Sequence, residues 1–490
     1  MSRPGGRPKW QNGLLGLTVV LAMAVPLPFS HTAKSQAASI RTDTASSGPS
    51  KAQRIKVLTA ALKLMHKNFA NLSQFTPSAQ DVFDYQVGDL WKQGIDGTGT
   101  TVAVMEGWND PKIGQIMAGF DQQLGLPKAQ FKTIYPTGLH KLPKKCPPGM
   151  VKLQNYGSCD GWAGELELDV ASVHLMAPYA KILIVVAPPD SEITDVGPSS
   201  CNPNLVTKSR ATAAWDDSPW VTAVGGTIPA FTSTGQRAGD DPVWNLGPEG
   251  LPFGEGAGFS VAFGRPSYMN DVAKITKSGE RSVPDISLDG SSGTSESGPL
   301  LAGILALATQ IHHHLNVGPI NPLLYGVLGP AGLKGGIADV VSGNNDVIRN
   351  GKVAVKGFAA AKGYDIASGW GTVRANTFAP ALAKAATAAH DNAAARSEAA
   401  KALLRLVHQV SLTKTVVRPS GSTKLTARGF LAGHPVVLAI DDHKIATLKA
   451  NSQGTVTFTI KPAALHLGRG RHIISLASML ITSTDSFRVS

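Results

Sequence analysis

The chain has 490 residues, of which 42% are hydrophobic and 16% are charged. This length and balance fit one large folded domain followed by a smaller one. The net charge of +12 comes from dispersed Lys and Arg residues without an aromatic and basic stripe, so no nucleic-acid partner is expected. The charge is weak evidence for contact with anionic cell-wall polymers or surfaces.

The first 38 residues have the features of a signal peptide. Arg3, Arg7 and Lys9 precede an apolar run from Leu14 to Val25, and small residues that suit signal peptidase follow. The apolar run is too short for a comfortable membrane span, and no later stretch is long enough. We therefore expect a secreted, extracellular protein with no membrane span in its mature form.

Residues 39–80 are predicted to be a short propeptide remnant or an N-terminal helix. Leu58, Leu62, Met65 and Phe69 recur at helical spacing. Such spacing predicts a helix that docks on the following domain through one apolar face.

Two carboxylic acids stand close together in GELELDVASVHLMAPYAKILIVVA, which starts at Gly164. On a helix, Glu165 and Asp169 share one face, while Glu167 points elsewhere. Two carboxyls at that distance cannot both ionise easily, so one pKa rises and the pair can hold a single proton. The alternative is an ordinary solvated acidic face, and this segment alone favours that alternative.

SGTSESGP, which starts at Ser292, runs into the apolar stretch LLAGILALA and contains a candidate serine nucleophile. Ser295 is expected at the start of a helix, where backbone N–H groups favour negative charge. Thr294 and Ser297 are expected to cap free amides, and Pro299 is expected in the first turn. A capped buried helix without chemistry is the alternative.

The composition changes near the C-terminus. Residues 379–406 are rich in Ala with interspersed charges, which predicts a helical linker. Residues 407–490 contain short β-type runs separated by turn residues, which predicts an immunoglobulin-like β-sandwich. Such modules are usually spacers or surface-binding units.

Taken together, GELELD and SGTSESGP resemble the sedolisin family of serine-carboxyl peptidases. The chain lacks the His-Gly-Thr-His segment from which subtilisin-type hydrolases take their base, so a carboxyl base is expected. The resemblance implies a peptidase domain over residues 81–378 with a subtilisin-like α/β fold, in which helices flank a mostly parallel sheet. Further segments match the family and follow its order along the chain. They are the segment that begins at Asp84, then SPWVTAVGGT, GAGFSVAFGRPSY, VPDIS and INPLLYGVLG.

The resemblance also implies a role for each site residue. Ser295 would be the nucleophile, Glu165 its general base, and Asp169 the partner that orients Glu165. Asp195, in Thr194-Asp195-Val196-Gly197, would stabilise the oxyanion. A carboxylic acid can donate a hydrogen bond only while it is protonated, so the resemblance implies activity at acidic pH. A simple turn residue is the alternative for Asp195.

One structural calcium ion is implied by the same resemblance. Oxygen-only ligands from carboxylates and loop carbonyls suit a hard cation. A glycine is usual at the position of Ala361, but a backbone carbonyl ligand tolerates the change if the dihedral angles allow it. The matching ligands are Asp339, Val340, Ala361, Gly363 and Asp365.

The expected function is therefore endopeptidase action on protein or peptide substrates by a secreted monomer. Two segments are shorter than in the family, one between Ala187 and Thr194 and one between Asp285 and Ser292. A catalytically impaired homologue that binds a surface through its C-terminal domain is the alternative.

Overall fold

The computed structural model describes most of the chain after residue 47. The predicted signal peptide, Asp195, all three cysteines and the part of the predicted linker beyond residue 391 lie outside the described residues. The described ranges are 48–72, 77–106, 109–135, 161–186, 216–232, 237–391, 409–428, 430, 435–441, 443–451, 454–478 and 481–490.

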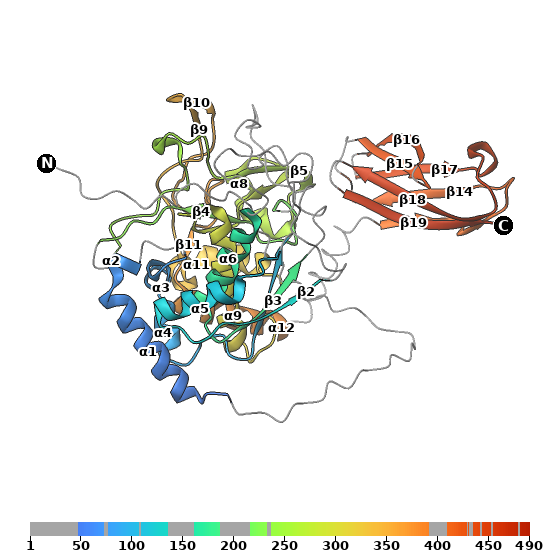
Figure 1. The fold of residues 1–490 in the computed structure, drawn as a ribbon. Coiled ribbons are helices and arrows are strands. Elements are labelled where there is room, and N and C mark those ends of the chain that lie inside the picture. Colours follow the sequence, from blue (N-terminus) through green and yellow to red (C-terminus); the bar gives the residue numbers. More distant parts are fainter. Residues whose placement is uncertain are drawn as a thin grey trace.

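Parallel strands form the centre of the large α/β domain (Figure 1). β1 (Thr101–Glu106), β3 (Lys181–Val186) and β2 (Gln130–Ile134) pair in that order, and β4 (Val224–Thr227) pairs with β7 (Ile286–Asp289). All of these pairings are parallel. In the described part of the chain the predicted parallel sheet therefore consists of a three-stranded set and a two-stranded set.

Short antiparallel pairs lie outside the parallel strands. β5 (Gly258–Gly264) pairs with β6 (Glu280–Val283), and β11 (Thr372–Val373) pairs with β8 (Ile337–Ala338). β9 (Val347–Arg349) and β10 (Lys352–Val355) form a hairpin. Short helices complete this region: α8 (Ala273–Thr276), α10 (Asn321–Leu323) and α11 (Gly329–Ala331).

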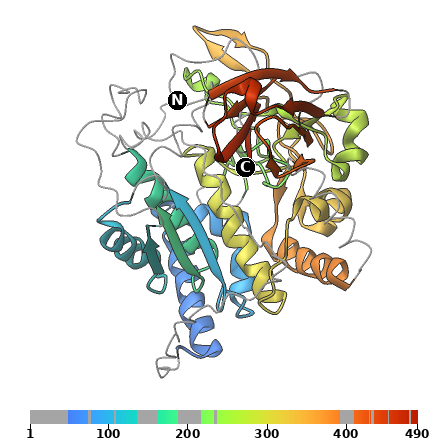
Figure 2. The same ribbon diagram turned by 90° about the vertical axis from the view of Figure 1, so that its right-hand side faces the viewer.

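Two long helices cross the core of this domain. α6 (Gly161–Met176) and α9 (Thr294–Ile311) pack against each other, and both contact β1. Figure 2 shows α9, in yellow, beside the parallel strands. α12 (Ala375–Asp391) packs on α9 and begins before the predicted linker, so the first part of that Ala-rich segment belongs to the core of the large domain.

The N-terminal helix α1 (Lys51–Lys67) is part of the same core. A capping box between Ser50 and Gln53 starts it, and its apolar residues Leu58, Leu62 and Met65 are buried. They belong to the hydrophobic cluster that also contains α6 and α9. The helix thus docks through the apolar face that its spacing predicts.

Three short helices follow α1 and lead into β1, and α5 comes after that strand. Phe69, which begins α2, is buried and packs 5.7 Å from Phe83 between ring centroids. These helices are α2 (Phe69–Leu72), α3 (Ala79–Asp84), α4 (Val87–Trp91) and α5 (Ile113–Leu124).

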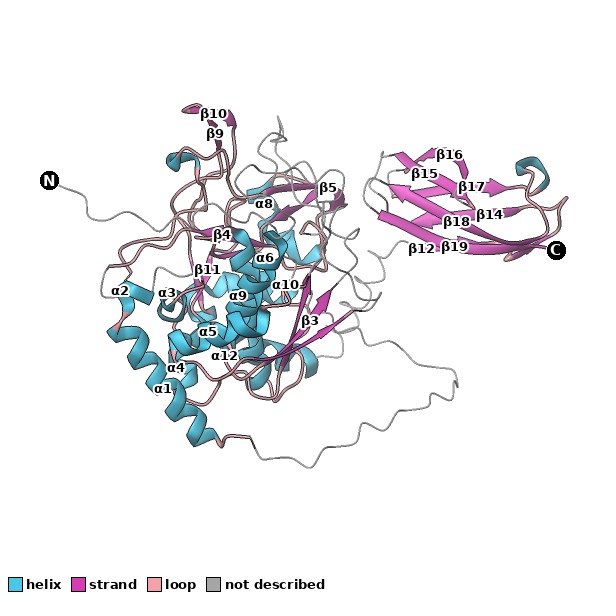
Figure 3. Ribbon diagram, in the orientation of Figure 1, coloured by secondary structure: helices cyan, strands magenta, loops and turns pink. Residues whose placement is uncertain are grey.

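The C-terminal part of the chain is an all-β unit with its own core (Figure 3). One sheet has the order β12-β14-β17 and the other β13-β19-β18-β15-β16. Leu425, Leu438, Ile460 and Leu476 are fully buried in it. The strands are β12 (Gln409–Leu412), β13 (Val416–Val417), β14 (Thr423–Arg428), β15 (Pro435–Ile440), β16 (His443–Lys449), β17 (Thr455–Ile460), β18 (Gly470–Ser478) and β19 (Ile481–Val489).

No helix in the described part of the chain combines the length and the apolar character that crossing a bilayer requires.

Candidate active site

Ser295 is the second residue of α9 and is fully buried. The helix begins directly after Gly293, whose φ of 119° lies in a region that favours glycine. The first N–H groups of a helix carry partial positive charge, which suits a nucleophile that develops negative charge. Ser295 thus lies at the start of a helix, as the sequence predicts.

The predicted caps of α9 are wrong. No side chain caps this helix, and the Ser297 hydroxyl instead donates to the carbonyl of Asp289 over 2.8 Å. Because the helix already starts at Thr294, Pro299 lies in the second turn rather than the first. Pro299 has no N–H, so the carbonyl of Ser295 lacks its usual partner four residues on.

Both carboxyls of the predicted pair lie on α6 and are fully buried. Glu165 and Asp169 each have a relative exposure of 0%, which excludes the solvated acidic face. Glu167 is half-buried on another side of the helix, facing Asp110. Burial and the Asp110 carboxyl raise the pKa of Glu167 to about 7.

The C-terminal ends of α6 and α9 meet at one loop. The backbone N–H groups of Asp96 and Gly97 donate to Gln310 Oε1, near the end of α9, over 2.8 and 2.7 Å. Gly97 also lies against Ala177, which directly follows α6: a Cβ added to the glycine would be 2.8 Å from the Ala177 Cβ. The two helices therefore run parallel.

A close contact sets the register of this helix pair. A Cβ on Gly303 of α9 would lie 3.0 Å from the Val173 carbonyl oxygen of α6. Ser295 stands eight positions before Gly303, and Glu165 stands eight positions before Val173. Parallel helices rise equally per residue, so Ser295 and Glu165 lie at the same end of the pair.

The Ser295 hydroxyl itself is unengaged in this structure. Its Oγ is buried and has no hydrogen-bond partner among the described residues. The hydrogen bond to Glu165 that the resemblance implies is therefore not formed. Asp195, the predicted oxyanion residue, lies outside the described part of the chain.

Part of the chain is similar to curated peptidases. Kumamolisin from Bacillus sp. (strain MN-32) is 26% identical over 357 residues, which are 56% of this chain and 59% of that protein. Tripeptidyl-peptidase 1 from Mus musculus is 32% identical over 186 residues, or 32% of this chain and 30% of that protein. These matches support membership of the sedolisin family. It spans less than two thirds of the length of these relatives, and no family model matches it.

A solved structure of Pseudomonas sedolisin, a serine-carboxyl proteinase complexed with two molecules of pseudo-iodotyrostatin, is similar to part of the chain. Its sequence identity to this chain is 22% and the TM-score is 0.47. The similarity covers 61% of this chain and 94% of the sedolisin chain.

The candidate calcium ligands of this chain lie on two loops that the fold brings together. The Gly363 N–H donates to Asp339 Oδ2 over 2.8 Å, although 24 positions separate these residues. The Ala361 N–H donates to Asp365 Oδ2 over 2.8 Å. Val340 is fully buried and anchors the first loop. Carboxylate and backbone oxygens of this kind are the ligands that a hard cation such as calcium prefers.

Ala361 fits its loop without strain. Its φ is not positive, whereas Gly363 has a φ of 79°. An alanine at position 361 therefore keeps the backbone carbonyl that a cation would bind, so the dihedral condition on this ligand is met.

A second group of acids near Ser295 was missed by the sequence analysis. Asp81 of α3, Asp289 at the end of β7, and Glu296 each offer a carboxylate oxygen, and these oxygens lie within 4.8 Å of one another. All three side chains are buried. Glu296 follows Ser295 directly, but Asp81 is distant in the sequence, and only the tertiary fold brings it to the group. We call these residues the acidic cluster.

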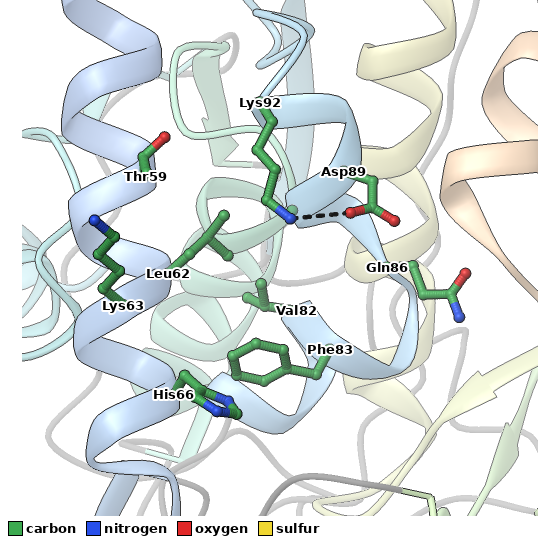
Figure 4. A pocket seen from close by; sticks show the side chains of 10 residues that line it. Thr59, Leu62, Lys63, His66, Val82, Phe83, Gln86, Asp89 and Lys92 are labelled. Atoms are coloured by element: carbon green, nitrogen blue, oxygen red, sulfur yellow. Dashed lines mark hydrogen bonds and ion pairs between the residues drawn. The ribbon is translucent and has the colours of Figure 1, made fainter.

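The structure also has a pocket of about 390 Å³ between α1 and the α3–α4 segment (Figure 4). Leu62, His66 and Phe83 line it, and Lys92 pairs with Asp89 over 3.2 Å at its edge. None of the predicted site residues lines this pocket. It is therefore distinct from the candidate active site.

Proposed function

We propose that this chain is a secreted serine-type endopeptidase that hydrolyses peptide bonds in proteins at acidic pH through Ser295, Glu165 and Asp169. The observation that carries the proposal is the burial of these three side chains on two packed parallel helices, with Ser295 and Glu165 at the same end of the pair. Burial disfavours the charged form of a carboxyl, so the buried Glu165 and Asp169 side chains are suited to share a proton at acidic pH. The sedolisin-family relatives support peptidase chemistry.

In the proposed mechanism the Ser295 Oγ attacks the scissile carbonyl carbon and transfers its proton to Glu165. Glu165 returns this proton to the leaving amine when the C–N bond breaks, and water then releases the acyl group from Ser295. Asp169 orients Glu165 and tunes its proton affinity. Asp195 in its protonated form donates a hydrogen bond to the oxyanion, which requires acidic conditions.

The proposal is tested by hydrolysis of a denatured protein between pH 2 and 6 in the presence of calcium. Wild-type protein is expected to cleave internal bonds, and Ser295→Ala is expected to lose cleavage. Ser267→Ala, on an exposed residue, is the matched control and should retain it. Unchanged hydrolysis in Ser295→Ala would refute the mechanism.

A catalytically impaired surface-binding protein is the second candidate. The observation that favours it is the unengaged Ser295 Oγ. Hydrogen bonds of a catalytic site often tighten only when substrate binds, so the first candidate remains the one that the geometry supports best. Folded wild-type protein that lacks hydrolysis across the whole pH range but binds cell-wall polymers through its C-terminal unit would establish the second.

Calcium is proposed to stabilise the loops that carry Asp339, Val340, Ala361, Gly363 and Asp365. A cation at these oxygens would join the two loops, and binding to the folded state alone stabilises it by about 2.7 kcal/mol at a hundredfold excess over Kd. We expect calcium to raise Tm and a chelator to lower it.

The Asp365→Ala variant is expected to lose the calcium response. Asp240→Asn, which removes one exposed carboxylate, should keep the response of wild type. Thermal unfolding with and without calcium, and with magnesium as the control ion, measures this. An equal response in wild type and Asp365→Ala would place the ion elsewhere.

A further inference from the structure

The acidic cluster binds the loop that leads into α9, directly before Ser295. Asp289, at the start of this loop, accepts the Ser291 N–H at Oδ1 over 2.7 Å. Glu296, just beyond its end, accepts the Ser292 N–H at Oε2 over 3.2 Å. Two members of the cluster thus hold successive backbone amides of one short turn.

The third member joins this turn to α3. Asp81 accepts the Ser78 N–H at Oδ2 over 2.7 Å, while its buried Oδ1 has no hydrogen-bond partner among the described residues. Gln80, the preceding residue, places its Nε2 3.5 Å from Asp289 Oδ2. A proton shared between carboxyl groups would supply the donor that Asp81 Oδ1 lacks.

The cations of this region are engaged by other acids. Arg237 pairs with both Asp84 and Asp241, and Arg374 lies 3.4 Å from Asp84 Oδ1. Within the described part of the chain no ion pair reaches the acidic cluster. Tyr85 faces it as a neutral group, because burial raises the pKa of its phenol well above the usual value, and its hydroxyl oxygen accepts the Asp289 N–H.

Ionisation of all three acids would place three negative charges within a few ångströms of one another in a buried site. We propose that Asp81, Asp289 and Glu296 are neutralised by shared protons and form an acid-dependent clamp on the loop that leads into α9 and Ser295. Release of these protons makes the carboxylates repel one another and loosens the turn. The inference concerns stability and does not depend on hydrolysis.

The pKa values of the three acids support proton uptake by the folded state. Burial raises the pKa of Asp289 to about 6. Burial and then repulsion by Asp289 raise the pKa values of Asp81 and Glu296 well above the usual range. A raised pKa means that the folded state holds protons that the unfolded state releases. The stabilisation is therefore complete below about pH 4 and is lost as pH rises through about 6 and above.

The clamp is tested by thermal unfolding from pH 4 to pH 7. Wild-type Tm is expected to fall by roughly 5 °C or more over this interval. Glu296→Gln and Asp81→Asn should each flatten the profile, because an amide does not titrate. Asp271→Asn removes an exposed carboxylate and should retain the wild-type slope. Other buried acids, such as Glu255, contribute equally to all four proteins.

Hydrogen exchange gives a local readout on wild-type protein. After correction for intrinsic rates, residues 289–300 should exchange faster at pH 7 than at pH 4, and the β14–β17 pair serves as the internal reference. Wild-type slopes in both amide variants would overturn the clamp. A Tm gain from a divalent cation that is lost in Glu296→Gln would also overturn it, since the cluster would then hold a cation.

Discussion

Replacement of Glu165 by glutamine is expected to lower kcat/KM for a protein substrate by roughly 10²–10⁴-fold, because the proposed general base is lost. Glutamine keeps the size of the side chain, so the contact between α6 and α9 should survive. Glu167→Gln is the matched control on the same helix. Glu167 is half-buried and faces Asp110, so its replacement should change the rate by no more than a few-fold.

The pH profile separates a positioning role from a catalytic one. Asp169→Asn is expected to shift the pH dependence of kcat/KM, because Asp169 tunes the proton affinity of Glu165 in the proposed mechanism. Circular dichroism and Tm confirm that each variant is folded. Full activity in Glu165→Gln, or an equal loss in Glu167→Gln, would contradict the assignment of the base.

Local patterns in the sequence were enough to place the helices of the candidate site. Carboxyls four positions apart predict a shared helix face, and α6 carries Glu165 and Asp169 in that way. The apolar run after Ser295 predicts the buried helix α9. The catalytic roles of Ser295, Glu165 and Asp169 stay predictions. A catalytic role depends on which side chains meet in the folded protein, and local spacing does not specify that.

The details at the start of α9 could not be predicted from local rules. Ser and Thr near a helix start usually cap it, but the Ser297 hydroxyl bonds to the carbonyl of Asp289 on a neighbouring strand. The acidic cluster could not be predicted from local rules either, because Asp81 belongs to a helix that is distant in the sequence. Tertiary contacts decide both features, and a single sequence contains no signal for them.

The VPDIS segment, which served only as a family marker, contains a fully buried carboxylate with several hydrogen-bond partners. Asp285 and Arg281 are both fully buried and form two hydrogen bonds of 2.7 and 2.6 Å. The Tyr325 hydroxyl and the Ala223 N–H donate to the same carboxylate over 2.7 and 2.8 Å. This carboxylate joins β7 to the segment before β4.

Removal of this carboxylate should strongly destabilise the large domain. Asp285→Ala leaves the Arg281 guanidinium buried without its charge partner, and broken buried pairs cost about 3–5 kcal/mol of unfolding free energy. Lys92→Met is the matched control, because it breaks an exposed pair with Asp89 and should cost less than about 1 kcal/mol. Urea unfolding followed by fluorescence measures both.

A double variant distinguishes an unpaired charge from a loss of packing. Arg281→Met combined with Asp285→Leu removes both charges and keeps apolar volume, so it should recover much of the stability that Asp285→Ala loses. If the double variant is as unstable as the single one, the hydrogen bonds from Tyr325 and Ala223 carry the stabilisation instead. If Asp285→Ala is no less stable than Lys92→Met, the buried pair contributes nothing to the fold, and the carboxylate joins β7 to its neighbour without stabilising it.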